Sequence, residues 1–200
     1  MSITDQVLKS IQDRGRGTVV TPKDFLDLGS RAAVDQALSR LARSGRIRRL
    51  ARGLYDYPRQ SPRLGELAPS PDAVARAVAR AADSRIMDSG AAAANRLGLT
   101  AQVPAKLVYL TDGPSRKVRI GRQVIALRHA APRTFVGAGG ASGTVIQALR
   151  HLGRAHIDDA VVQTLRRKLS DDDRRAVARD AIHAPGWMRP ILDRLAAPAA

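Results

Sequence analysis

The sequence predicts a protein of the α+β class, in which helices and small antiparallel sheets occupy separate stretches of the chain. Two observations support this class. Apolar residues recur at helical spacing over residues 3–43, and the period shortens to that of strands over residues 47–57. Further strand-like runs between residues 106 and 129 then precede new helical patterns. The 200 residues, 44% of them hydrophobic, are enough to close a core.

The N-terminal stretch predicts three helices. The first covers residues 3–11 and stops at nearby glycines. The second is short: Thr21 is a capping residue, proline follows it, and Asp24 stands three residues after the cap, so a helix is expected up to residue 28. Ser30 caps the third helix. Its buried face is predicted to hold Val34, Ala37, Leu38 and Leu41.

A hairpin is predicted next, with short strands at residues 47–50 and 54–57 around Gly53. Three helices followed by such a hairpin are typical of a winged helix-turn-helix, so residues 1–63 are predicted to be a DNA-binding domain of that kind. Tyr55 and Tyr57 are expected to pack in its core.

The segment QSPRLGELAPSP, residues 60–71, has three prolines and little periodicity, which indicates a linker. A C-terminal domain of residues 64–200 is expected to follow, with a small antiparallel sheet and several helices. The predicted strands are 106–111, 116–120 and 123–129, and the predicted helices are 72–83, 91–97, 143–152, 158–168 and 170–183. No element is assigned to residues 184–200.

The net charge of +16 and the pI near 11.5 favour a polyanionic partner, first nucleic acid and second an acidic protein. An Arg- and Ala-rich composition also results from a GC-rich genome, so charge alone does not decide. The excess is greatest at the N-terminal end, where residues 1–63 hold 13 Lys and Arg against 6 Asp and Glu. This bias agrees with a DNA-binding domain at that end.

The predicted DNA contacts lie on the third helix and the hairpin. Gln can bond adenine and Arg can bond guanine through two hydrogen bonds each, whereas cations on a wing contact phosphate or the minor groove. The alternative is an ordinary solvated surface. The candidate residues are Arg31, Gln36, Ser39, Arg40 and Arg43 on the helix, and Arg46, Arg48, Arg49 and Arg52 on and beside the hairpin.

No catalytic residue, metal site or cofactor is expected. The chain has no cysteine, and its four histidines lack the spacing of metal ligands. GAGGASG, residues 137–143, lacks the ending of a phosphate-binding loop. The acidic groups at residues 158–159 and 171–173 precede helical patterns and are expected to cap them, with Ser170 and Asp173 as a capping pair. No leader or membrane-spanning run is expected, and the predicted location is the cytoplasm, at the nucleoid.

Two stretches resemble a known family. They are VVTPKDFLDLGSRAAVDQALSRLARSGRIRRLARGLYDYP and SRIMDSGAAAANRLGLTAQVPAKLVYLTDGPSRKVRIG. They are similar to the AbiEi-type antitoxins of bacterial type IV toxin–antitoxin systems, which act in abortive infection. The most specific parts are GAAAANRLGL, QVP and YLTDGPSR, in that order.

The resemblance implies a DNA-binding domain that represses its own operon, often at inverted repeats. It also implies a C-terminal domain that antagonises a nucleotidyltransferase-like toxin, with direct binding of the toxin left open. Several residues of the second stretch fall in the matching region without an assigned role: Ser89, Asn95, Arg96, Thr111, Asp112, Arg116 and Lys117.

Two other functions stay open. One is a stand-alone transcription factor whose second domain senses a ligand or dimerises. The other is a nuclease-associated enzyme that uses Asp158, Asp159 or the acids at residues 171–173 on bound nucleic acid.

Overall fold

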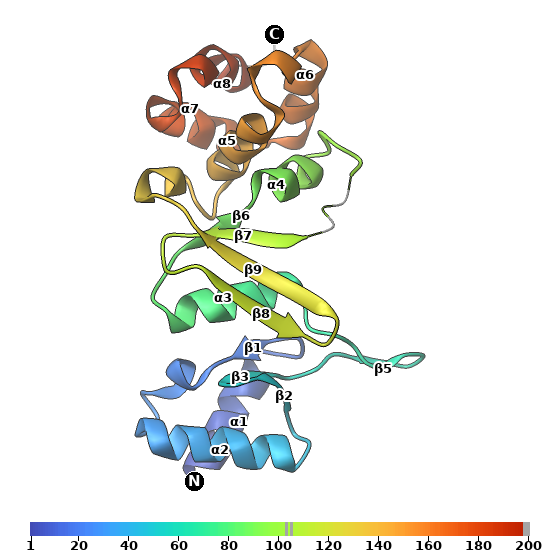
Figure 1. The fold of residues 1–200 in the computed structure, drawn as a ribbon, viewed down its shortest axis with the longest axis vertical. Helices are drawn as coiled ribbons and strands as arrows, with labels where there is room; N and C mark the ends of the chain where they lie inside the picture. Colours follow the sequence, from blue (N-terminus) through green and yellow to red (C-terminus); the bar gives the residue numbers. More distant parts are fainter. Residues whose placement is uncertain (103, 105, 198–200) are drawn as a thin grey trace. The chain divides into compact units, whose positions relative to one another are not determined.

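A computed structural model of the protein describes residues 1–102, 104 and 106–197 (Figure 1). The chain has the α+β composition expected, with helices and small antiparallel sheets. It divides into two compact units. The first is Met1–Ser84 with Lys117–Ile125, and the second is Arg85–Arg116 with Ala126–Ala200.

The first unit begins with helices packed on a three-stranded sheet. Its elements are α1 (Ile3–Asp13), β1 (Val19–Val20), the 3-10 helix η1 (Pro22–Phe25), α2 (Arg31–Arg43), β2 (Arg48–Ala51), β3 (Leu54–Asp56), β4 (Gln60–Ser61), β5 (Gly65–Glu66) and α3 (Pro71–Ala81). The predicted first and third helices and the hairpin are thus confirmed, and the predicted second helix is a single 3-10 turn. It ends before Leu26 and Asp27, which face solvent.

The sheet of this unit has the order β1-β3-β2, with both pairs antiparallel. β1 was not predicted, because two residues are too few to show a strand period. Its Val19 and Val20 pair with Asp56 and Tyr55 of β3. Figure 1 shows α1 and α2 on one side of these strands and α3 on the other.

One apolar cluster holds this half of the unit together. Val7 and Ile11 of α1 meet Val34 and Leu38 of α2, and all four are fully buried. Tyr55 is buried in the same cluster and Tyr57 is half-buried against it, which confirms the core position predicted for both tyrosines. The predicted buried face of the third helix is also confirmed, because Ala37 and Leu41 complete the cluster.

The predicted linker is held against the first unit. β4 and β5 pair as a small hairpin, and α3 is tied back to the sheet by Arg80. The Arg80 Nη2 donates to the carbonyl oxygen of Val19 (3.0 Å), and its Nε lies 3.1 Å from an Asp24 carboxylate oxygen. The compact units therefore divide the chain after Ser84. A boundary between separately folding domains at residues 63 and 64 stays a prediction.

The second unit combines a sheet with a helical bundle. Its elements are β6 (Ile86–Asp88), α4 (Gly90–Arg96), β7 (Leu107–Thr111), β8 (Arg116–Ile120), β9 (Gln123–His129), η2 (Pro132–Phe135), α5 (Ala141–Leu152), η3 (Arg154–His156), α6 (Asp159–Lys168), α7 (Asp171–Asp180), η4 (Ala181–His183), η5 (Gly186–Met188) and α8 (Arg189–Ala196). The sheet order is β6-β7-β9-β8. Residues Lys117–Ile125, which make up most of β8 and the start of β9, belong to the first unit. The three predicted strands are confirmed.

One strand and one α-helix of this unit were missed, together with the 3-10 turns η2, η3 and η5. β6 has only three residues, and α8 lies in the stretch that was left without an assignment. Prolines at 185 and 190 interrupt the sequence there, yet Met188, Leu192 and Leu195 are fully buried in the core that α5 and α6 share. Tertiary packing therefore stabilises a helix of only eight residues. No helix of the described residues is both long and apolar enough to span a membrane.

Leu38→Ala tests the core of the first unit. The side chain is fully buried between α1 and α2, so its truncation leaves a cavity and is expected to lower the free energy of unfolding by about 2–5 kcal/mol. Gln36→Ala, on the exposed side of the same helix, is the control and is expected to change it by less than about 0.5 kcal/mol. Equal losses in urea titrations of the two variants would contradict this orientation of α2.

Candidate nucleic-acid interface

The outer face of α2 carries most of the predicted helix contacts. Because the helix buries the stripe from Val34 to Leu41, the residues about half a turn away face solvent. Gln36, Arg40 and Arg43 are exposed, and Ser39 is half-buried. Arg31 lies at the flank, where its Nε is 3.0 Å from a carboxylate oxygen of Asp35. The helix thus brings a potential base reader and two guanidinium groups to one side.

Five arginine side chains form no ion pair with another described residue. They are exposed, and among the described residues none of them makes an ion pair or a side-chain hydrogen bond. They run from the second half of α2 through the following turn and along the β2–β3 hairpin. An unpaired guanidinium presents five N–H donors to a ligand, which suits the oxygen atoms of phosphate and guanine. The five are Arg40, Arg43, Arg46, Arg49 and Arg52.

Arg48 differs from this set because it is paired with acidic side chains, and its predicted contact with DNA stays a prediction. Its Nε and Nη2 donate to the two carboxylate oxygens of Asp56 at 3.1 and 2.7 Å, in a bidentate pair. Nη2 also donates to the carbonyl oxygen of Leu67 (2.8 Å), and Nη1 lies 3.4 Å from Glu66. The hydrogen bond to Asp56 raises the pKa of Arg48 above its usual value. Arg48 therefore fastens the strand to residues 66–67.

The alternation of side chains along β2 explains the difference between Arg48 and Arg49. Successive residues of a strand point to opposite faces of the sheet, and in this register Arg48 pairs with Asp56 and Arg49 with Tyr55. Asp56 is fully buried and needs a cation. The sequence does contain a signal for this ion pair: Asp56 is the only carboxylate between Asp35 and Glu66, in a stretch rich in arginine. A buried Asp56 would therefore be expected to pair with one of the hairpin arginines.

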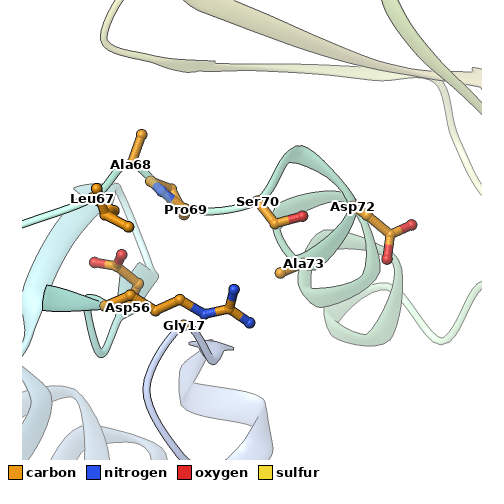
Figure 2. Close-up of a pocket in the computed structure, with 9 residues that line it drawn as sticks. Gly17, Asp56, Leu67, Ala68, Pro69, Ser70, Asp72 and Ala73 are labelled. Atoms are coloured by element: carbon orange, nitrogen blue, oxygen red, sulfur yellow. The ribbon is translucent and has the colours of Figure 1, made fainter. Parts of the chain in front are cut away.

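A pocket of about 300 Å³ lies between the end of β3, residues 67–70 and the start of α3 (Figure 2). In Figure 2, Asp56 and Leu67 line one side, and Ser70 and Ala73 line the side formed by α3. Gly17 is favoured here because its φ of +91° lies in the left-handed region, which other residues rarely adopt. Since Arg48 already neutralises Asp56, the pocket offers no unpaired buried charge to a ligand.

Four of the residues singled out by the family resemblance make local structural bonds in the second unit: Asn95, Arg96, Thr111 and Asp112. The Arg85 backbone N–H and Nε each donate to the Asp112 carboxylate at 2.7 Å, and the Thr111 hydroxyl donates to the Arg85 carbonyl (3.0 Å). Asn95 donates to the carbonyl of Thr100, and Arg96 pairs with Asp88. These bonds fix turns and strand ends. Lys117 and Arg116 are exposed.

The acidic groups near the helix starts act as predicted. Asp158 caps α6 by accepting from the backbone N–H of Val161, and Ser170 and Asp173 form the predicted capping box of α7. Asp159 pairs with Arg194. Within the part of the chain that the structure describes, no three His, Asp or Glu side chains come together as a metal site would require.

Comparisons with known proteins place the chain in a family but assign it no activity. Residues 6–177 match the family described as "Family of unknown function (DUF6088)", and the chain belongs to that family. No curated protein matches it. A crystal structure of the RV2827C protein from Mycobacterium tuberculosis is similar at 17% identity and a TM-score of 0.42, over 96% of this chain and 81% of that one. A likeness at this level carries no argument about function.

Arg48→Ala tests the internal pair. Its removal leaves the buried Asp56 carboxylate without a partner, so the free energy of unfolding is expected to fall by about 2–4 kcal/mol, toward the lower end because the Arg48 side chain is 31% exposed. Arg49→Ala removes the same charge from the next residue, where no bond is lost, and is the control. If urea denaturation gives the two variants the same stability, Asp56 does not depend on Arg48.

The ion pair of Asp112 with Arg85 is expected to make the stability of the folded protein depend on pH. The hydrogen bond from Arg85 holds the pKa of the Asp112 carboxyl below its usual value. A carboxyl with a lowered pKa stabilises the fold above its unfolded value, about 3.9, and loses this contribution as the pH falls through the folded value. Asp112→Asn is therefore expected to destabilise the protein at pH 7 and to flatten its decline in acid below about pH 4. Thermal unfolding between pH 7 and pH 2.5 measures both effects, and an unchanged acid slope would contradict the assignment.

Proposed function

We propose that this member of the DUF6088 family is a winged-helix DNA-binding regulator that represses its own operon and serves as the antitoxin of a bacterial toxin–antitoxin system. One observation carries the DNA-binding half. The stripe Val34, Leu38 and Leu41 is buried, which turns Arg40 and Arg43 of α2 toward solvent, and the following turn and hairpin add the exposed Arg46, Arg49 and Arg52. The net charge of +16 supports an anionic partner.

In this proposal α2 is the recognition helix and the β2–β3 hairpin is the wing. Gln36 lies in the first half of α2, where recognition helices contact base edges, and its amide suits adenine. Arg40 and Arg43 suit guanine or phosphate. Arg49 and Arg52 are assigned to the phosphates or the minor groove beside the helix, together with Arg46 in the turn.

The antitoxin half rests on the resemblance to AbiEi-type antitoxins. The motifs GAAAANRLGL and YLTDGPSR supply α4 and the turn at Asp112, where the structure has the bonds of Arg85, Thr111 and Asn95. The proposed partners are the protein's own operator in double-stranded DNA, as inverted repeats, and a nucleotidyltransferase-like toxin. The protein would then act in the cytoplasm, at the nucleoid.

Footprinting on the DNA upstream of the gene is the direct test. A regulator of its own operon is expected to protect a site with inverted repeats there, and to leave a scrambled duplex unprotected at the same concentration. Failure to protect any upstream site would overturn the proposed autorepression. For the antitoxin half, co-expression of the full chain with a neighbouring nucleotidyltransferase-like protein is expected to restore growth, and an unrelieved growth defect would leave a stand-alone transcription factor as the function.

Gln36→Ala and Arg52→Ala separate base reading from phosphate binding. Loss of a bidentate contact to a base costs about 1–3 kcal/mol, so Gln36→Ala is expected to weaken binding to the operator while the scrambled duplex is unaffected. Loss of a phosphate contact acts on every sequence, so Arg52→Ala is expected to weaken both duplexes and to lower the salt slope by about 0.9.

Titrations of the operator and of the scrambled duplex over several salt concentrations measure both effects. Arg31→Ala is a useful comparison, because Arg31 is already paired with Asp35 and is expected to contribute less than Arg52. Equal weakening of both duplexes by Gln36→Ala would mean that α2 does not read bases.

A further inference from the structure

The β8–β9 hairpin is a second strongly basic element of the chain, outside the proposed recognition helix and wing. Lys117, Arg119 and Arg122 are exposed, and none of these three described residues makes an ion pair or a side-chain hydrogen bond. The sequence between Asp112 and Asp158 has no carboxylate at all. The positive charge of the hairpin therefore has no acidic neighbour along the chain to offset it.

The turn of the hairpin presents Arg122 at its tip. Gly121 and Arg122 are the two residues between the strands, and Gly121 has a φ of +56°. A glycine with positive φ at the first central position is typical of the tight II′ turn of two-residue hairpins. The turn leaves the Arg122 side chain free at the end of a two-stranded ribbon.

The pattern of burial places the other two cations on the outer face. On β9, Ile125 and Leu127 are buried, whereas Val124 between the turn and Ile125 is 40% exposed. On β8, residues 118 and 120 are half-buried and Lys117 and Arg119 are exposed. Because side chains alternate along a strand, Lys117 and Arg119 share one face, about 6.6 Å apart by the rise of two strand residues.

We infer that Lys117, Arg119 and Arg122 form a phosphate-binding ribbon that contacts the backbone of the DNA duplex in addition to the proposed recognition helix and wing. The inference rests on the proposed function, because it names a second contact with the same partner. A two-stranded ribbon fits the dimensions of a DNA groove.

Protection of a sheet edge is the competing explanation, because β8 is the outer strand of its sheet and charged residues at an edge prevent pairing with other chains. Charges of either sign serve that purpose. Edge protection therefore explains neither the absence of acids from Asp112 to Asp158 nor the arginine at the turn. An anionic partner explains both features.

The test compares two triple variants that lose the same charge. One is Lys117→Gln, Arg119→Gln and Arg122→Gln in the hairpin. The control is Arg150→Gln, Arg154→Gln and Lys168→Gln, three exposed cations of the second unit for which the structure gives no partner. Affinity for the operator and for a scrambled duplex is measured from low to physiological salt, with circular dichroism to verify folding.

The hairpin variant is expected to lower the slope of log K against log salt by about 2–3 for both duplexes, because each lost phosphate contact removes about 0.9. The ratio of the two affinities is expected to stay as in the wild type. The control variant and the charge-conserving variant Lys117→Arg, Arg119→Lys and Arg122→Lys are expected to keep the wild-type slope. If the triple variant aggregates, Arg122→Gln alone is expected to lower the slope by about 0.9.

Failure of the inference and failure of the proposed function give different results. A wild-type protein that binds neither duplex overturns the proposed function and the ribbon together. A wild-type protein that binds the operator, with an unchanged slope in the hairpin variant, overturns the ribbon alone. An equal loss of slope in the control also overturns it, because net charge then explains the effect. Loss of binding to an acidic protein or to RNA, with DNA binding intact, assigns the ribbon to that other partner.

Discussion

The burial of one side of α2 is the constraint on which the rest of the first unit depends. Val34, Leu38 and Leu41 fill the space against α1, and no rotation of the helix about its axis keeps them there while turning Arg40 and Arg43 inward. The orientation of the polar face is therefore fixed by the hydrophobic effect acting on its opposite side. The charges of Arg40 and Arg43 determine what the exposed face of α2 can bind, but they do not determine its orientation.

In the β2–β3 hairpin, the adjacent residues Arg48 and Arg49 likewise differ in surroundings: one is paired inside the fold and the other faces solvent. Arg48 and Arg49 have the same chemistry, but the alternation of the strand gives one a buried carboxylate and the other solvent. Arg48 holds Asp56 and the carbonyl of Leu67, so it stabilises the hairpin that presents Arg49 and Arg52. A loss of DNA affinity on mutation of Arg48 would reflect this support, whereas a loss on mutation of Arg49 would reflect a contact.

Sequence reasoning predicted the elements that have a long apolar period or clear caps, and missed those that depend on distant packing. Ser30, Thr21 and Ser170 mark helix starts because a capping side chain acts within three residues. β1 and α8 were missed, since two valines beside β3 and an eight-residue helix with a proline near its start are stable only against partners far along the chain. The ion pair of Arg48 was missed for the same reason, because the register of the hairpin places Arg48 opposite Asp56.

The placement of acids is more informative than the number of arginines. A GC-rich genome accounts for frequent arginine anywhere in the chain, but it does not account for where carboxylates are absent. The acids that the structure describes largely cap helices or pair with arginines, as Asp24, Asp112 and Asp158 do. Two stretches escape this compensation: residues 36–65, whose single acid is consumed by Arg48, and residues 113–157, which have none. Each stretch contains one of the two basic hairpins, and five exposed cations of these hairpins make no ion pair among the described residues: Arg49, Arg52, Lys117, Arg119 and Arg122.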